Sequence, residues 1–297
     1  MPLTLTGPDD IPRLIRAAPI GISITDAAGR YEMVNPAYCD FYGYTEQELL
    51  GQPFTMMVPS EQRRRLLEMH QRLIRGEEDL ARRQEWEVRR KNGERRTVIA
   101  EAARIFDNTG EAKKVTFVTD ITERKALERR LDYLARHDEL TGLLNRRAGL
   151  ARLEEELERH RRLGGALCVA ICDLDHFKQV NDRHGHAVGD EALQGAADVL
   201  LRGLRHYDVL ARLGGEEFLV ILPGVTRPGA ETSLERLRCK LSATPLARPR
   251  LHLTFSAGVA ALAGNEEASH ALLERADRAL YRAKASGRNC IRAAQND

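Results

Sequence analysis

One seven-residue stretch decides the fold of the C-terminal half of this chain: Arg212-Leu-Gly-Gly-Glu-Glu-Phe218. Apolar runs at residues 209–213 and 218–222 flank it, and both predict short strands. Gly214-Gly215 predicts the tight turn between them, because glycine accepts positive φ at no steric cost. Glu216 and Glu217 would then lie on opposite faces of the second strand. An anion can approach this bare backbone beside carboxylates that suit Mg²⁺, although a hairpin with a solvated, charged tip is the alternative.

A second group of carboxylates follows a buried strand upstream. Residues 166–172 read Ala-Leu-Cys-Val-Ala-Ile-Cys, an apolar run typical of a strand that is buried on both faces. Asp173-Leu-Asp-His-Phe-Lys178 comes directly after it. Carboxylates at the end of a central strand, before a loop and a helix, are well placed to bind a metal and phosphate. Two acidic sites on separate elements can hold one or two Mg²⁺ ions, and a solvated acidic loop is the alternative.

Further motifs in the same half establish a family resemblance. They are Asp138-Glu-Leu-Thr-Gly-Leu-Leu-Asn-Arg-Arg147, Arg205-His-Tyr-Asp208, Leu253-Thr-Phe-Ser-Ala-Gly-Val259 and Ala276-Asp-Arg-Ala-Leu-Tyr-Arg-Ala-Lys-Ala-Ser-Gly-Arg-Asn289. Residues 137–297 therefore resemble the GGDEF family of diguanylate cyclases. That family joins two GTP molecules into cyclic di-GMP and releases two pyrophosphates. The resemblance implies a central mixed or antiparallel sheet surrounded by helices.

The resemblance also implies roles for the residues around the hairpin. Asp173, Glu216 and the backbone carbonyl of Leu174 would hold Mg²⁺ or Mn²⁺. Glu217 would either assist deprotonation of the attacking 3′-hydroxyl or support a second ion, and the sequence leaves both roles open. Backbone amides at residues 176–178 would cradle phosphate oxygens at the start of a helix.

Substrate contacts follow from the same resemblance. Lys284 and Arg288 are four residues apart and would grip the β- and γ-phosphates from one helix face, if the helix runs that far. Asn181 and Asp190 occupy guanine-reading positions, and an aspartate can accept from the adjacent donors of guanine, which adenine lacks. GTP is therefore the expected substrate. The remaining substrate-binding positions are Lys178, His186, Gly214 and Gly215, of which His186 can equally be a local hydrogen-bond partner.

Arg205 and Asp208 form the Arg-x-x-Asp pattern of the family's product-inhibition site. Arginine can bind guanine acceptors or phosphate, and aspartate can accept from guanine N1–H. Arg236 would add a further arm from the next helix. A surface ion pair is the alternative interpretation of this pattern.

Residues 10–122 predict a second α+β domain. Short strands are expected at residues 20–25 and 31–34, and Asn92-Gly93 is a strong signal for a two-residue hairpin. Thr45 and Glu48 form a capping box. With Asn35-Pro-Ala-Tyr38 and Asp120-Ile-Thr-Glu123, this order resembles a PAS sensor domain.

The resemblance leaves the ligand of that domain open between haem, flavin, a small molecule and none. His70 on a predicted helix is a candidate haem ligand, with a packing role as the alternative. Trp86 and Tyr42 can either line a ligand pocket or fill the core. The cysteine motif of flavin-adduct photosensors is absent.

Residues 123–136 predict a helical linker with a narrow apolar stripe: Ala126, Leu127, Leu131 and Leu134. This stripe predicts a short parallel coiled coil, and packing of the helix on its own domain is the alternative. Because each GGDEF domain holds one GTP, the resemblance implies a homodimer with two facing sites. A PAS signal would change the crossing or register of the leucines. A non-catalytic GTP or cyclic di-GMP receptor and a cyclase with another product are the competing interpretations, and Asp190 disfavours the latter.

Charge and composition exclude some classes of partner. The net charge of +2 gives no strong electrostatic case for nucleic acid. No run reaches the roughly 18 apolar residues of a membrane span, and the N-terminus lacks a signal-peptide pattern. The five cysteines show no Cys-x-x-Cys spacing, and Cys168 and Cys172 fall in the buried strand. We therefore expect a reduced, cytoplasmic protein without a nucleic-acid partner or a membrane span.

Overall fold

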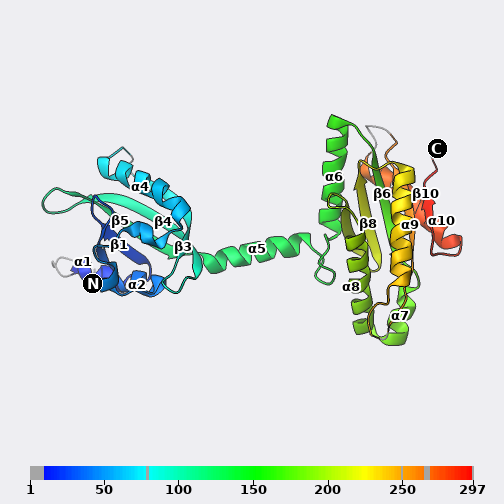
Figure 1. Ribbon diagram of the computed structural model, residues 1–297, viewed down its shortest axis with the longest axis horizontal. Helices are drawn as coiled ribbons and strands as arrows, with labels where there is room; N and C mark the ends of the chain where they lie inside the picture. Colours follow the sequence, from blue (N-terminus) through cyan, green and yellow to red (C-terminus); the bar gives the residue numbers. More distant parts are fainter. Residues whose placement is uncertain (1–9, 78–79, 249, 264–267, 296–297) are drawn as a thin grey trace, which may run out of the picture. The chain divides into compact units, whose positions relative to one another are not determined.

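The structure, a computed structural model, describes residues 10–77, 80–248, 250–263 and 268–295. The chain divides into two compact units, Met1–Arg130 and Leu131–Asp297 (Figure 1). Each unit contains its own five-stranded sheet with packed helices, so the predicted α+β class is confirmed. Within the described residues, every helix is too short or too polar to cross a lipid bilayer.

The N-terminal unit is built on an antiparallel sheet in the order β2-β1-β5-β4-β3. Its strands are β1 Gly21–Thr25, β2 Tyr31–Val34, β3 Leu80–Arg89, β4 Arg95–Phe106 and β5 Ala112–Asp120. The β3–β4 turn is one residue longer than the two-residue type that Asn92-Gly93 predicts. The Arg90 amide bonds to the Glu94 carbonyl at 2.9 Å, and Gly93 adopts a φ of 86° within this loop. Such a left-handed residue is usual at the end of a three-residue hairpin loop.

Short helices and one long helix complete this unit. They are α1 Asp10–Ala17, α2 Pro36–Tyr42, α3 Glu46–Leu49, the 3₁₀ helix η1 Phe54–Met57 and α4 Ser60–Arg75. The buried Asn35 begins α2, because its side-chain oxygen accepts from the amides of Tyr38 and Ile22. The predicted capping box of Thr45 and Glu48 is present in α3. Helix α4 packs against β3, β4 and β5 (Figure 1).

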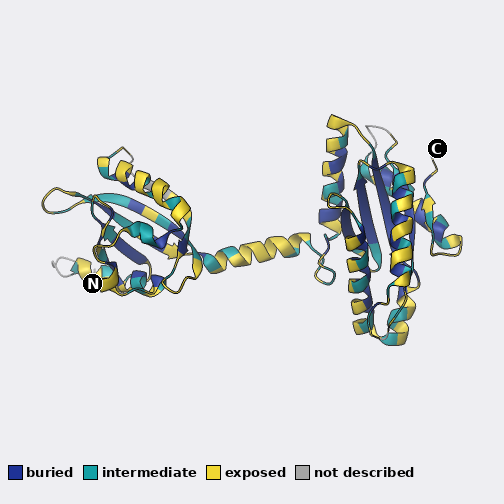
Figure 2. Cartoon of the chain, in the orientation of Figure 1, coloured by how far each residue is buried: buried dark blue, intermediate teal, exposed yellow. Residues whose placement is uncertain are grey.

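The C-terminal unit has the sheet order β10-β9-β6-β8-β7. Its strands are β6 Leu167–Leu174, β7 Val209–Gly214, β8 Glu217–Pro223, β9 Phe255–Ala261 and β10 Ile291–Ala293. The central strand β6 is antiparallel to β8 and β9, whereas β10 is parallel to β9. Every residue of β6 is buried, as the apolar run predicts (Figure 2).

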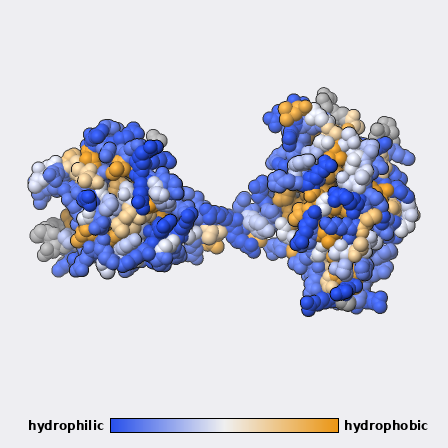
Figure 3. Space-filling view, in the orientation of Figure 1, coloured by the Kyte–Doolittle hydropathy of each residue, from blue (hydrophilic) through white to orange (hydrophobic). Residues whose placement is uncertain are grey.

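Helices cover both faces of this sheet. They are α6 Arg146–Leu163, α7 Phe177–His184, α8 His186–Gly203, α9 Arg227–Ala243 and α10 Ser269–Ala285. Alternate residues of β6 pack into two separate cores. Cys168 and Cys172 lie with α8 and α9, and Val169 and Ile171 lie with α6 and α10. Figure 3 shows hydrophilic side chains over most of the visible face of both units.

One glycine permits the contact between α10 and β9. A Cβ on Gly258 would lie 2.0 Å from the Ala276 carbonyl oxygen and 2.1 Å from the Leu280 amide nitrogen. Both are backbone atoms of α10, so the helix could not accommodate a methyl group without moving. Gly258 therefore sets the position of α10 on the sheet.

We expect Gly258→Ala to destabilise the C-terminal unit by about 1–3 kcal/mol or more, because it overpacks a backbone contact. Urea unfolding followed by circular dichroism measures the change. Gly229→Ala is the matched control: its new Cβ meets the movable Val225 side chain at 3.1 Å, within a helix. The control should be neutral or slightly stabilising. Equal midpoints for wild type and Gly258→Ala would show that α10 moves freely on the sheet.

Candidate functional site

The edge of the sheet where β6 ends carries the predicted carboxylates. Asp173 lies opposite Glu217 in the β6–β8 register, and the Leu174 amide bonds to the Glu216 carbonyl oxygen at 3.2 Å. Strand β8 begins at Glu217, so Glu216 lies in the turn rather than on the strand. The prediction that the two glutamates occupy opposite strand faces is therefore wrong. The tip of the hairpin is Gly215-Glu216, because a register shift brings Gly214 opposite Glu217.

An arginine that the sequence interpretation did not single out holds this turn in place. Gly214 and Gly215 have φ values of 146° and 52°, which glycine alone adopts readily. The Arg212 guanidinium donates to the Gly215 carbonyl oxygen at 2.8 and 3.0 Å, and to both oxygens of Asp138 at 2.9 and 3.0 Å. Asp138 also accepts from Thr141. Arg212 thus joins the opening motif to the glycine turn.

Lys284 on α10 forms an ion pair with Asp173, with 2.7 Å between Nζ and Oδ2. Burial raises the pKa of Asp173 even though Lys284 and Arg288 lower it. Burial, and next the charge of Asp173, also raise the pKa of Glu217. Crowded, partly buried carboxylates of this kind favour a cation beside them.

Arg288 does not share a helix face with Lys284. Helix α10 ends at Ala285, and both Arg288 and Asn289 adopt left-handed conformations, with φ values of 62° and 47°. The conditional prediction of a two-pronged grip from one helix is therefore wrong in its geometry. Arg288 still lies close enough for its charge to lower the pKa of Asp173, against the larger effect of burial. Both cations thus belong to the same site.

Asp175 is a buried anchor that the sequence interpretation did not assign. Its carboxylate accepts from the Thr254 hydroxyl at 2.6 Å, the Ser256 hydroxyl at 2.7 Å and the Asn289 amide at 3.0 Å. These partners lie just before and at the start of β9, and in the turn after α10. Asp175 therefore fixes the turn that carries Arg288 against the end of β6. The recurrence of hydroxyl residues at 254 and 256 is the sequence signal that could have indicated it.

The predicted guanine and phosphate positions lie around α7 and α8. His176 precedes α7 with a φ of 58° and makes no side-chain capping bond, so the amides of the first turn have no such partner. Lys178 and His186 are exposed on these helices. A Cβ on Gly189 would lie 1.8 Å from Asn181 Oδ1, so Asn181 packs directly on the residue before Asp190. Asn181 thus lies against the backbone of α8 next to Asp190 in the chain.

Arg205 and Asp208 form a tight turn after α8. The Arg205 backbone amide donates to Asp208 Oδ2 at 2.8 Å, whereas Asp208 Oδ1 is buried without a hydrogen-bond partner. An orphaned acceptor of this kind can receive a ligand N–H. Arg236 donates to the Gly203 carbonyl oxygen at 2.8 Å, which places it beside the same turn.

The carboxylates at this sheet edge suit a hard cation that takes its remaining ligands from water and substrate. Among the described residues, no three His, Cys, Asp or Glu side chains lie close enough together to hold a metal ion by themselves. Mg²⁺ typically uses one or two protein carboxylates and completes its shell with water and substrate phosphate. Asp173 and Glu217, paired across two strands with Glu216 next along the chain, suit that chemistry.

The fold and the carboxylate hairpin define an α+β domain with acidic and basic groups gathered at one sheet edge, joined to a second α+β domain. The sequence profile described as "Diguanylate cyclase, GGDEF domain" matches residues 135–290, more than half of the chain. The chain belongs to the GGDEF family. A second profile, "PAS fold", matches residues 15–126. Both resemblances identified from the sequence motifs are confirmed.

Known proteins are similar to one or both domains. Diguanylate cyclase DgcP of Pseudomonas aeruginosa is 48% identical over 160 residues, covering 53% of this chain and 24% of the relative. Diguanylate cyclase DgcM of Escherichia coli K12 is 34% identical over 284 residues, covering 95% of this chain and 67% of the relative. The coiled coil and GGDEF domain of DgcB from Caulobacter crescentus, solved in complex with c-di-GMP, gives a TM-score of 0.54 at 34% identity, covering 58% of this chain and 94% of that chain. This chain thus spans about a quarter of the length of DgcP and about two thirds of DgcM.

We expect Asp175→Asn to lower both the stability of the C-terminal unit and the affinity of its site for nucleotide. The amide would direct an N–H₂ group toward existing donors, at a cost of about 1–3 kcal/mol. Thermal unfolding and titration with a fluorescent GTP analogue measure the two effects. Asp182→Asn, on the exposed side of α7, is the matched control and should change neither. Unchanged nucleotide affinity in Asp175→Asn would contradict the positioning role.

Proposed function

We propose that this chain is a diguanylate cyclase, which condenses two GTP molecules into cyclic di-GMP and two pyrophosphates. The observation that carries the proposal is the Asp173–Glu217 pair at one sheet edge, with Lys284 2.7 Å from Asp173. Negative groups for a metal and positive groups for phosphate thus lie side by side. The competing interpretation, a non-catalytic receptor, would not require this complete set of groups.

Each 3′-hydroxyl attacks the α-phosphorus of the other GTP in line, and the bond to pyrophosphate breaks as the new P–O bond forms. Positioning and charge neutralisation dominate such a reaction. Asp173, Glu216 and the Leu174 carbonyl would hold Mg²⁺ or Mn²⁺, which neutralises phosphate charge when bound. Glu217, whose pKa is raised by burial, is suited to receive the hydroxyl proton.

The other substrate contacts use the charges and dipoles around the hairpin. Lys284, Arg288 and Lys178 bind phosphate oxygens, helped by the start of α7. The exposed backbone of Gly214 and Gly215 allows close approach of the nucleotide. Asn181 and Asp190 read guanine in this proposal, and the packing of Asn181 on Gly189, the residue before Asp190, supports it. His186, at the start of α8, lies beside them along the chain.

Product binding at a second site provides feedback. Asp208 Oδ1 is buried without a partner, which supports acceptance from guanine N1–H, and Arg205 and Arg236 supply the positive charge. DgcB, a related protein, was solved with c-di-GMP bound. Cyclic di-GMP is therefore both product and feedback ligand in this proposal.

The enzyme acts as a homodimer controlled by its PAS domain. Each chain supplies one nucleotide site, and the reaction needs two facing each other. Helix α5, Thr122–Arg136, buries none of its residues, and Leu127 and Leu131 are 57% and 67% exposed. This supports pairing of α5 with a second copy rather than packing on its own domain. Asp120 begins the helix, since its carboxylate accepts from the Thr122 amide at 2.8 Å, so β5 of the PAS domain leads directly into α5.

The proposed activity is tested by incubating purified protein with GTP and Mg²⁺ and resolving the products by chromatography. Wild type should produce cyclic di-GMP, and Glu216→Ala should reduce turnover at least a hundredfold because it removes a metal ligand. ATP should give no cyclic product. Absence of product from wild type with GTP still bound would favour the receptor interpretation.

Retained product is distinguished by a further variant in the same experiment. Arg205→Ala should restore turnover if cyclic di-GMP bound near Asp208 inhibits the wild type, and it should raise the inhibition constant of added product at least tenfold. If the wild type makes no product and Arg205→Ala makes none either, inhibition by retained product does not explain the inactivity of the wild type.

Leu131→Lys should weaken dimerisation and turnover together, each at least tenfold, because burial of a leucine contributes about 1.5–3 kcal/mol per copy. Sedimentation velocity and the cyclase assay measure the two effects. Leu163→Lys at the end of α6 is the matched control, since this leucine is 76% exposed on a different helix. If Leu131→Lys preserved both dimer and turnover, the α5 seam would have no coupling role.

A further inference from the structure

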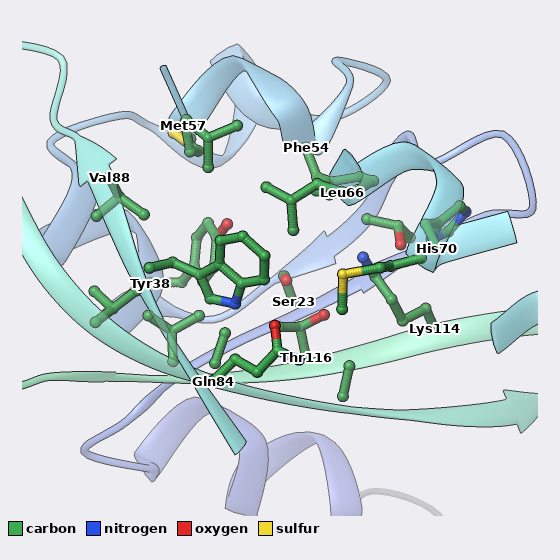
Figure 4. Close-up of a pocket in the computed structure, with 18 of the residues that line it drawn as sticks. Ser23, Tyr38, Phe54, Met57, Leu66, His70, Gln84, Val88, Lys114 and Thr116 are labelled. Atoms are coloured by element: carbon green, nitrogen blue, oxygen red, sulfur yellow. The ribbon is translucent and has the colours of Figure 1, made fainter. Parts of the chain in front are cut away.

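The PAS domain contains a cavity of about 100 Å³ between its sheet and α4 (Figure 4). Apolar and aromatic side chains form most of the wall, among them Phe54, Met57, Leu66, Trp86 and Val88. An apolar cavity of roughly 150 Å³ in another protein holds benzene, so this smaller cavity suits an occupant of about four to six non-hydrogen atoms. Haem and flavin are much larger than that.

A polar strip crosses the floor of this cavity. Ser23 lies opposite Thr116, and Thr25 lies opposite Lys114, in the antiparallel register of β1 and β5. All four residues line the cavity, so they share one face of the sheet. Directly opposed residues have Cβ atoms about 5 Å apart, which places the Thr25 hydroxyl near the Lys114 side chain. Figure 4 shows Lys114 among the residues that line the cavity, and its charge acts on His70.

Lys114 differs from the neighbouring lysine in its partners. Lys113 points to the other face and contacts Glu32 at 2.6 Å, Glu111 at 3.2 Å and Asp107 at 3.6 Å. Lys114 is 7% exposed and has no carboxylate partner among the described residues. Its recorded contact is with the Phe54 ring, 3.6 Å from Nζ to the ring centre. A buried ammonium whose only neighbour is an aromatic ring costs folding free energy unless an anion pairs with it.

Two more polar atoms of the cavity wall lack partners. Thr25 Oγ1 and His70 Nδ1 are buried and make no hydrogen bond. His70 Nε2 lies 3.2 Å from the Ala27 carbonyl oxygen, so that nitrogen carries the proton. Burial, and next the charge of Lys114, lower the pKa of His70 to about 4, which keeps the ring neutral. The ring is thus a packing residue bonded to Ala27, whereas Lys114 and Thr25 remain able to donate to an anion.

We propose that this cavity binds a small aliphatic monocarboxylate. Its carboxylate accepts from Lys114 Nζ and Thr25 Oγ1, and its hydrocarbon part packs against Trp86 and Phe54. The site is partly open, because Trp86 and Gln84 in the wall are only half-buried. A ligand can therefore enter between β3 and α4. The proposal rests on the PAS domain alone and does not depend on the cyclase activity.

The opposing possibility is that Lys114 is an uncharged amine that only packs against the cavity wall. Burial lowers the pKa of Lys114 to about 7, so the amine is easily deprotonated in an empty cavity. A bound carboxylate would raise the pKa of Lys114 again, because it would form an ion pair with the ammonium. Acids and their neutral amides have nearly the same shape, and the comparison between them separates the two possibilities.

The experiment is calorimetric titration of the protein with sodium propionate, butyrate and isobutyrate, each beside its amide. At least one acid should bind at least tenfold more tightly than its amide. Lys114→Met, which keeps the length and apolar character of the side chain, should remove at least tenfold of the acid affinity and leave the amide unchanged. Thr25→Val, a smaller change, should weaken the acid at least threefold.

Circular dichroism establishes that each variant is folded. If Lys114→Met does not fold, Thr25→Val and the acid–amide comparison in wild type still decide the question. Three results would overturn the proposal: equal affinity for acid and amide, unaltered acid binding in both variants, or no binding of any probe. Haem or flavin absorbance in the purified protein would overturn it as well.

Discussion

The candidate site depends on one buried carboxylate, that of Asp175. It receives hydrogen bonds from Thr254, Ser256 and Asn289, which come from segments far apart in the sequence. Because a buried carboxylate is costly without donors, these three segments are held together. The strand carrying Asp173, the start of β9 and the turn carrying Arg288 therefore keep a fixed relation. Gly258 adds a steric constraint to this arrangement, since it lets α10 bring Lys284 to Asp173.

The hairpin is held from its other side by Arg212. Burial alone would raise the pKa of Asp138, but the hydrogen bonds from Thr141 and Arg212 outweigh it and lower that pKa. Asp138 is therefore ionised, and the fork of Arg212 joins it to the Gly215 carbonyl oxygen. A planar guanidinium can make paired bonds to both partners at once, which the three donors of a lysine ammonium cannot reproduce. Positioning of Glu216 thus depends on charge-assisted bonds outside the signature motif.

Sequence patterns predicted the elements of the fold because their signals are local. Apolar alternation and capping residues predicted the strands and several helix starts, and ordered motifs predicted both families. The details that went wrong depend on geometry across strands or beyond a helix end. A register shift in the hairpin moves Glu216 into the turn, and the end of α10 at Ala285 separates Arg288 from the helix. Asp175 was not assigned, because its donors at 254, 256 and 289 become neighbours only in the folded chain.

Three lysines show how partners determine what a buried or half-buried ammonium can do. Lys113 is surrounded by three carboxylates and stabilises the fold, and its bond to Glu32 is the main cause of its raised pKa. Lys284 is paired with one carboxylate, Asp173, at the site where we propose that phosphate binds. Lys114 has a cavity in place of a carboxylate. A bound anion stabilises most strongly a charge that has no complete ion pair within the chain. In the PAS domain that charge is the ammonium of Lys114 on β5. Because β5 leads directly into α5, a ligand bound to Lys114 would act on the strand that is connected to the helix of the proposed dimer.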